Sequence, residues 1–203
     1  MPKLKYKEFE EILRNVSFFN FKSVEARLGK KYAKLFIHNL KKKGEIEELI
    51  KGWYSFKPSP YLILLIMREG YIGLGSAAFI HKAWNQITNL EILTPLAYKK
   101  LRGGERVVAG RKVIIKWLPQ KMYFGYEIKL FDNRYIRVSD TEKTFIDLIY
   151  FGYPFKDEIL PQLIKKIDKQ KLLSYLELLR KRKLKRLSRF LSSLNKEFPD
   201  LFS

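Results

Sequence analysis

Apolar residues near the start of the chain recur at helical spacing. Phe9, Ile12 and Leu13, followed by Val16, are three and four positions apart and so fall on one stripe of a helix. Charged residues occupy most of the positions between them. This pattern predicts an amphipathic first helix whose four apolar side chains face a core.

Two more helices are predicted before the first hairpin. Ser23 or Asn20 can cap a short helix, SVEARLG, which Gly29 ends. A third helix, KKYAKLFIHNLKKKG, begins at Lys30 and stops at Gly44. The segments EIEELI and WYSFK then alternate like two strands, and the turn signal Lys51-Gly52 lies between them.

The order helix, short helix, basic helix and two-stranded hairpin is that of a winged helix-turn-helix, whose third helix enters the DNA major groove. Ala33, Ile37 and Leu40, with Phe36, should face the core. The opposite side should carry Lys31, Lys34, Leu35, His38 and Lys42. We expect contacts at or near base edges from Lys31, Lys34 and His38. Phosphate contacts are expected from Lys30, Lys41, Lys42, Lys43 and the wing residue Lys51.

A second region begins at the proline-rich boundary after Lys57. Ser59 is the expected N-cap of a helix, YLILLIMRE, that has Pro60 at its first position and ends at Gly70. Another helix is expected over roughly 76–84.

From Leu90 the pattern changes to strands: LEILT, then RVV and KVIIKWL around Ala109-Gly110, then YEIKLF and RYIRV around Asp132-Asn133. A capping box formed by Ser139 and Glu142 then starts the helix TEKTFIDLIYF. The expected fold class is therefore α+β, with an antiparallel meander in this second region.

The last fifty residues predict helices capped by Asp157 and Asp168. An apolar seam is expected from Leu184, Leu187, Leu191, Leu194 and Phe198. Beside it lies a dense basic run that can contact DNA, an acidic partner protein or only solvent; its candidate contacts are Arg180, Arg182, Lys183, Arg186 and Arg189. We thus expect a winged helix at 1–57, an α+β domain at 58–152, and basic helices at 153–203 packed on that domain.

Several of these segments resemble the AbiEi antitoxin family of transcriptional regulators from abortive-infection, type IV toxin–antitoxin systems. They are the wing-type start, GYIGLGSAAFIHKAWNQ, LEILTP and, most specifically, RYIRVSDTEKTFIDLIYF. The resemblance covers roughly residues 8–152.

The resemblance implies a repressor that binds inverted repeats in its own promoter, and a second domain that counters a nucleotidyltransferase-like toxin. By position, DNA contacts fall on the face of Lys31, Lys34 and His38, and on the wing near Lys51 and Trp53. For the family's Glu-Lys and following Asp, here Glu142, Lys143 and Asp147, we expect a structural role.

Composition favours an acidic partner. Lys and Arg number 41 against 21 Asp and Glu, a formal charge of +20, and the surplus is +7, +6 and +7 in residues 1–57, 58–155 and 156–203. Charge spread along the whole chain excludes a basic tail on a neutral domain and makes nucleic acid the leading partner class. A heat-adapted surface explains many charges, but not this excess of positive ones.

Other features exclude function classes. The chain has no cysteine, which excludes disulfides and thiolate chemistry, and no apolar run long enough to cross a membrane. Neither His38 nor His81 belongs to a metal-binding spacing, and no phosphate-binding loop is present. We therefore expect a cytoplasmic, non-enzymatic protein with no cofactor or metal, as a monomer or weak homodimer.

Three hypotheses remain open. The first is a repressor that binds double-stranded promoter DNA. The second is an RNA-binding or ribosome-associated basic protein, because the charge covers the entire chain. The third is a protein-interaction module that neutralises a cognate toxin through the second domain.

Overall fold

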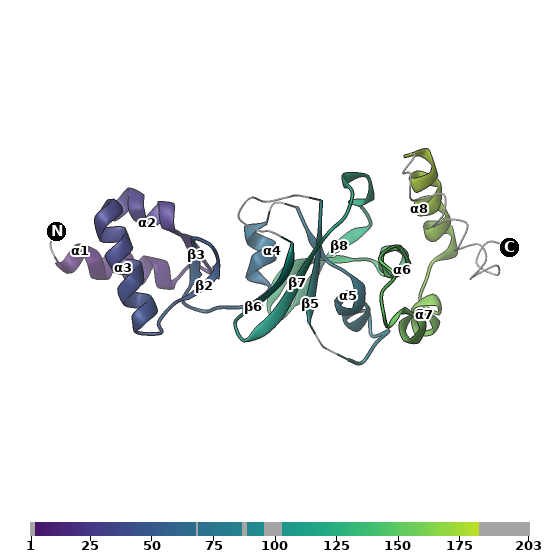
Figure 1. Ribbon diagram of the computed structural model, residues 1–203, viewed down its shortest axis with the longest axis horizontal. Coiled ribbons are helices and arrows are strands. Elements are labelled where there is room, and N and C mark those ends of the chain that lie inside the picture. The colour runs from purple at the N-terminus through teal and green to yellow at the C-terminus, as the bar shows by residue number, and fades with distance from the viewer. Residues whose placement is uncertain (1–2, 68, 87–88, 96–102, 183–203) are drawn as a thin grey trace.

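The computed structural model describes residues 3–67, 69–86, 89–95 and 103–182 of the 203-residue chain. Helices and two separate sheets make it an α+β fold, as the sequence predicts. Figure 1 shows a small helical unit with a three-stranded sheet at one end, a six-stranded sheet in the middle, and the last two described helices at the other end.

The first unit follows the predicted order of helices and hairpin. It contains α1 (Lys3–Arg14), α2 (Phe21–Leu28), α3 (Lys30–Lys42), β2 (Glu47–Ile50) and β3 (Trp53–Ser55). A two-residue strand that the sequence did not predict, β1 (Phe19–Asn20), pairs with β3, so the antiparallel sheet has the order β1-β3-β2.

The apolar stripe of α1 differs from the prediction. Leu13 is buried, but Ile12 is 59% exposed and Val16, beyond the helix end, is 42% exposed. The side of α1 that packs inward is instead formed by Tyr6, Phe9 and Leu13. Tyr6 was not included in the predicted stripe, yet its ring meets that of Phe36 edge-on at 5.5 Å. The aromatic rings of Tyr6 and Phe9 bury more surface than Ile12 would, which sets the rotation of the helix.

The second unit adds short helices around the larger sheet. Its elements are α4 (Leu62–Ile66), β4 (Tyr71–Ile72), α5 (Leu74–Ile80), β5 (Leu90–Thr94), β6 (Gly104–Val108), β7 (Arg111–Trp117), the 3-10 turn Gln120–Met122, β8 (Tyr126–Phe131), β9 (Arg134–Ser139), α6 (Thr141–Tyr150), α7 (Lys156–Ile164) and α8 (Lys169–Lys181).

The expected antiparallel meander is wrong, because the sheet is mixed. Its strand order is β6-β7-β5-β4-β9-β8, and the pairs β5–β7 and β4–β9 are parallel. Both expected hairpins are present, with Ala109-Gly110 and Asp132-Asn133 all at positive φ, as tight mirror-image turns require. The two-residue strand β4 joins the two hairpins into one sheet through β5 and β9.

Several helix ends in this unit also differ from the predictions. Ser59 does not cap α4, which starts at Leu62 and ends at Ile66, well before Gly70. Helix α5 ends at Ile80 rather than near Trp84. Asp157 lies in the first turn of α7 and does not cap it, because the helix already begins at Lys156.

Three hydrophobic clusters hold the described chain together. One lies inside the first unit, and a second joins the sheet to α4. The third brings α5, α6, α7 and α8 together around Tyr71 and Phe145. Leu49 and Ile50 of the first hairpin belong to the second cluster, so this hairpin packs on the larger sheet.

The C-terminal seam from Leu184 to Phe198 falls outside the described residues, as do Lys183, Arg186 and Arg189. Among the helices that are described, none is both long and apolar enough to span a bilayer.

Candidate nucleic-acid interface

Helices α2 and α3 are joined by a single residue, Gly29. Its φ of +78° favours glycine, and its N–H donates to Glu25 O while its carbonyl accepts from Ala33 N at 2.9 Å. Asn20 caps α2 by accepting from Ser23 N at 2.9 Å, so of the two expected caps Asn20 provides the side chain. This tight junction fixes the angle at which α3 leaves α2.

The buried face of α3 matches the prediction. Ala33, Phe36, Ile37 and Leu40 are all at most 5% exposed, and they pack against α1, α2 and the hairpin. The residues expected on the other side are exposed: Lys31, Lys34, Leu35, His38 and Lys42. Leu35 is 53% exposed, an apolar side chain in the middle of a basic face. The helix is thus anchored by one side and open on the other.

The cations of this region divide into two kinds. Lys41 Nζ lies 2.8 Å from Glu48 Oε2, and Lys43 Nζ lies 3.7 Å from Glu45 Oε1. Within the described part of the chain, five of the predicted contact residues are exposed without an ion-pair partner: Lys30, Lys31, Lys34, Lys42 and Lys51. These five ammonium groups are therefore free to meet an anion.

Glu48 connects the end of α3 to the hairpin. Its carboxylate accepts from Lys41 Nζ and, at 2.9 Å, from Gly52 N in the hairpin turn. Partial burial opposes its ionisation, but the Lys41 ammonium and the Gly52 N–H outweigh this and lower the pKa of Glu48. Glu48 therefore stays ionised and holds the turn at Lys51-Gly52 beside the C-terminal half of α3.

Trp53, which was expected to contact DNA from the predicted wing, is less exposed than such a contact requires. It is half-buried, its ring centroid lies 5.5 Å from that of Phe18, and it packs on the cluster that joins the hairpin to the larger sheet. Two exposed residues of α3 were not predicted as contacts, Tyr32 and Asn39. Tyr32 is 48% exposed and neighbours Lys31. Tyr32 and Asn39 are seven residues apart, which places both on one ridge of the helix. This spacing was the sequence signal that could have identified them.

The described part of the C-terminal basic run consists of Arg180, Lys181 and Arg182, of which Lys181 has an ion-pair partner. Arg182 donates to Lys121 O, and its guanidinium lies 5.2 Å from the Phe124 ring centroid. Lys181 pairs with Glu177 at 2.7 Å. Arg180 is exposed. The two contacts of Arg182 tie the end of α8 to the segment before β8.

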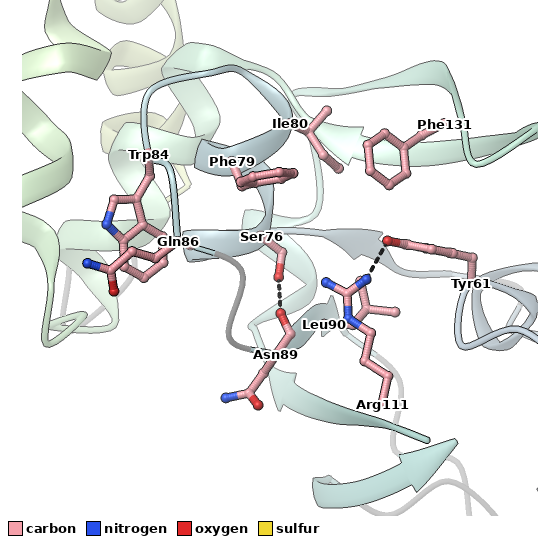
Figure 2. Close-up of a pocket in the computed structure, with 11 residues that line it drawn as sticks. Tyr61, Ser76, Phe79, Ile80, Trp84, Gln86, Asn89, Leu90, Arg111 and Phe131 are labelled. Atoms are coloured by element: carbon pink, nitrogen blue, oxygen red, sulfur yellow. Dashed lines mark hydrogen bonds between the residues drawn. The ribbon is translucent and has the colours of Figure 1, made fainter. Parts of the chain in front are cut away.

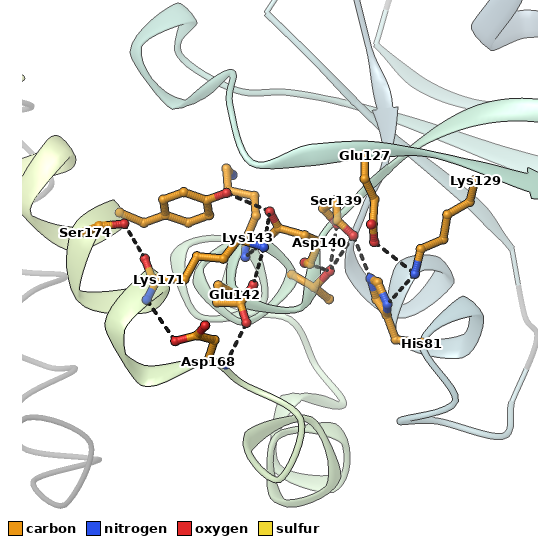
Figure 3. Close-up of polar contacts among 12 residues, drawn as sticks. His81, Glu127, Lys129, Ser139, Asp140, Glu142, Lys143, Asp168, Lys171 and Ser174 are labelled. Atoms are coloured by element: carbon orange, nitrogen blue, oxygen red, sulfur yellow. Dashed lines mark hydrogen bonds and ion pairs between the residues drawn. The ribbon is translucent and has the colours of Figure 1, made fainter.

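A second polar cluster surrounds α6 (Figure 3). Lys143 and Asp147 are fully buried and form an ion pair, and Tyr71 completes the group by donating to Asp147 Oδ2 at 2.9 Å. Burial lowers the pKa of Lys143 and raises that of Asp147, and the ion pair opposes both shifts. Because no part of either side chain reaches solvent, the geometry suits an internal support of the fold.

The expected capping box at α6 is wrong by one residue. Asp140, and not Ser139, is the N-cap, and its Oδ1 accepts from Lys143 N at 2.8 Å. Glu142 then lies too early in the helix to reach back to the cap. Its carboxylate instead accepts from Asp168 N at 2.8 Å and pairs with Lys171 Nζ at 2.9 Å (Figure 3).

Glu142 consequently joins α6 to α8. Burial disfavours its charged form, but Lys171 and the Asp168 N–H outweigh this and lower the pKa of Glu142. Asp168 caps α8 as the sequence predicts, accepting from Lys171 N at 3.2 Å.

Both ring nitrogens of His81 contact polar groups of the sheet. Its Nε2 lies 2.6 Å from Ser139 O, and Lys129 Nζ lies 3.3 Å from Nδ1 (Figure 3). Burial lowers the pKa of His81. A neutral ring that donates through Nε2 and accepts through Nδ1 satisfies both contacts.

The pocket in Figure 2 lies between α5, β5 and Arg111, whose guanidinium donates to Tyr61 Oη at 2.7 Å. Its volume of about 10 Å³ suffices for roughly one water molecule. Among the described residues, no three or more His, Cys, Asp or Glu side chains lie together so that they could hold a metal ion. No protein-family model matches the chain, and no curated protein sequence matches it significantly.

Proposed function

We propose that this chain is a DNA-binding transcriptional regulator of the AbiEi antitoxin type, which represses its own promoter by binding inverted repeats. The observation that carries the proposal is α3, whose apolar side is buried while its other side presents cations without ion-pair partners. A helix anchored in this way fits the width of the DNA major groove.

Within this proposal the residues have different roles. Lys31, Lys34 and His38 lie on the exposed side of α3 and contact base edges. Lys30, Lys42 and Lys51 contact phosphates. Lys41 and Lys43 act mainly through Glu48 and Glu45, which orient them beside the hairpin.

The resemblance to antitoxins supports a second part of the proposal. The larger sheet and its helices counter a nucleotidyltransferase-like toxin in the cytoplasm, without an enzymatic activity of their own. The buried group of Lys143, Asp147 and Tyr71 stabilises this part.

The proposal is tested by fluorescence anisotropy with the full chain, its own promoter fragment, a scrambled duplex and a structured RNA. A promoter preference that survives about 150–200 mM salt is expected, because contacts to phosphates alone weaken steeply over that range. Lys34→Ala should weaken promoter binding by about tenfold or more. Lys166→Ala removes an exposed lysine of the loop between α7 and α8 and serves as the matched control.

Equal affinity for the promoter and the scrambled duplex would contradict a sequence-specific regulator. Tighter binding of the structured RNA than of either duplex would favour the RNA-binding hypothesis instead.

A further inference from the structure

Strand β8 forms one edge of the larger sheet and has an apolar outer surface. Tyr126, Ile128 and Leu130 are 38%, 68% and 63% exposed. Tyr135, opposite Leu130 on β9, is 71% exposed. Together with Leu65 of α4, at 45%, these side chains make one apolar patch along the sheet edge. Exposed apolar patches of this kind mark interaction sites more often than isolated residues do.

The outer backbone edge of the same strand is not paired with another strand among the described residues. In an antiparallel ladder, only alternate residues direct N–H and C=O toward the neighbouring strand. Asp140 N donates to Gly125 O at 2.9 Å, and the pairing of β8 with β9 has no register shift. The residues that face β9 are therefore odd-numbered, and Tyr126, Ile128 and Leu130 direct their backbone groups outward.

We propose that two copies of this chain associate through β8, in an antiparallel pair whose two-fold axis passes between the two Ile128 residues. The two sheets then form one continuous sheet across the interface. A two-fold interface must be complementary to itself, because the same surface serves both copies. The β8 strand meets this condition in its backbone, its charges and its apolar side chains.

Charge selects the register. With the axis at Ile128, Glu127 lies opposite the partner's Lys129, and Lys129 lies opposite the partner's Glu127. An axis at Glu127 would place two carboxylates opposite each other, and an axis at Lys129 two ammonium groups, which is destabilising. Glu127 Oε1 and Lys129 Nζ already lie 2.9 Å apart within one chain (Figure 3), so four alternating charges would line this side of the interface.

The apolar side is equally matched in this register. Tyr126 lies opposite the partner's Leu130, and Ile128 opposite the partner's Ile128. Ile128 is an outward-facing position, so its N–H and C=O exchange hydrogen bonds across the axis. Charged residues on an edge strand ordinarily discourage pairing. Here the charges alternate in sign, so pairing with a second copy places each charge opposite one of the other sign. Burial of the apolar patch stabilises the dimer further.

A second copy is favoured over an unrelated protein because the segment Glu127-Ile128-Lys129 is complementary to itself. In an antiparallel pair, each Glu127 lies opposite a Lys129 of the other copy. The inference does not depend on DNA binding and is tested without DNA. If both proposals hold, the dimer carries two α3 helices related by the same two-fold symmetry as an inverted repeat.

The test is sedimentation equilibrium of the full chain from low to several hundred micromolar, with the variants Glu127→Lys and Lys129→Glu. The unmodified chain is expected to dimerise. Each variant places like charges at both cross-strand pairs and should raise the dimer dissociation constant by about tenfold or more. An equimolar mixture of the two variants restores every opposite pair and should recover the affinity. Glu105→Lys is the matched control, since Glu105 lies on the other edge strand, β6, and pairs with Lys112 of the neighbouring strand β7.

Cross-linking tests the same axis independently of charge. The chain has no native cysteine, so Ile128→Cys introduces a single thiol for a short bifunctional maleimide. Val107→Cys, on β6 and 70% exposed, is the control. Efficient covalent dimers from Ile128→Cys, and few from Val107→Cys, are expected. A monomeric chain over the whole range, or a dimer that neither charge variant weakens, would overturn the proposal.

Discussion

The backbone N–H of Ala109 donates a 2.6 Å hydrogen bond to Glu47 Oε1. Glu47 begins the hairpin of the first unit, and Ala109 lies in the tight turn between β6 and β7 of the larger sheet. The carboxylate thus connects two parts of the chain that are 62 residues apart.

Replacing this carboxylate should weaken the connection. Glu47→Ala removes a charged acceptor and is expected to lower the free energy of unfolding by about 1–2 kcal/mol. Urea denaturation measures the change. Glu105→Ala removes a glutamate from an exposed ion pair and should cost less than about 0.5 kcal/mol. Equal losses in the two variants would argue against a connecting role for Glu47.

The buried pair in α6 should respond differently to single and double substitution. Lys143→Met leaves Asp147 ionisable, fully buried and without its cation, so a loss of about 3–5 kcal/mol is expected. Adding Asp147→Leu removes that charge and should recover a large part of the loss. Chemical denaturation of both variants checks this, and a double variant no more stable than Lys143→Met would contradict it.

The contact between α6 and α8 should depend on pH. The pKa of Glu142 lies below its ordinary value of 4.5 in the folded protein, so its ion pair with Lys171 adds stability above that pH. This contribution disappears as the pH falls through the folded value. We expect unfolding midpoints of the unmodified chain to fall more steeply below pH 4.5 than those of Glu142→Gln. Parallel curves for the two proteins would exclude this origin of acid sensitivity.

The junction between α2 and α3 should be intolerant of a side chain. A Cβ at Gly29 would meet no atom within 4 Å, so the effect of Gly29→Ala is confined to the backbone at φ +78°. A loss of about 1–2 kcal/mol is expected in thermal or urea unfolding. Lys22→Ala, an exposed change in the same helix pair, should leave stability nearly unchanged.

Local patterns predicted much of this fold correctly. Both turns, at Ala109-Gly110 and Asp132-Asn133, follow from residue types that suit tight hairpins, and the faces of α3 follow from helical spacing. The strand β4 has only two residues, Tyr71 and Ile72, which is too few to show a period. The parallel pairs it helps to organise join segments far apart in sequence, and no local pattern carries that information.

The candidate interface was predicted to a similar extent. Exposure of Lys31 and Lys34 depends on helical spacing alone. The ion pair of Lys41 with Glu48 depends on how α3 packs beside β2, and the burial of Trp53 depends on the larger sheet. At α6 two adjacent residues, Ser139 and Asp140, were both suitable caps, and the chain's path selected Asp140.

Leu49 and Ile50 are buried in the cluster that includes Val108 and Val113 of the larger sheet. The hairpin therefore belongs structurally to both units, although residue 57 is where the sequence suggests a boundary. A chimera that transplanted residues 1–57 onto a foreign protein would expose these two side chains to water. Recombination between this chain and another of the same fold would accordingly have to exchange the hairpin and the β6–β7 turn together, which limits how freely this helical unit can be shuffled during evolution.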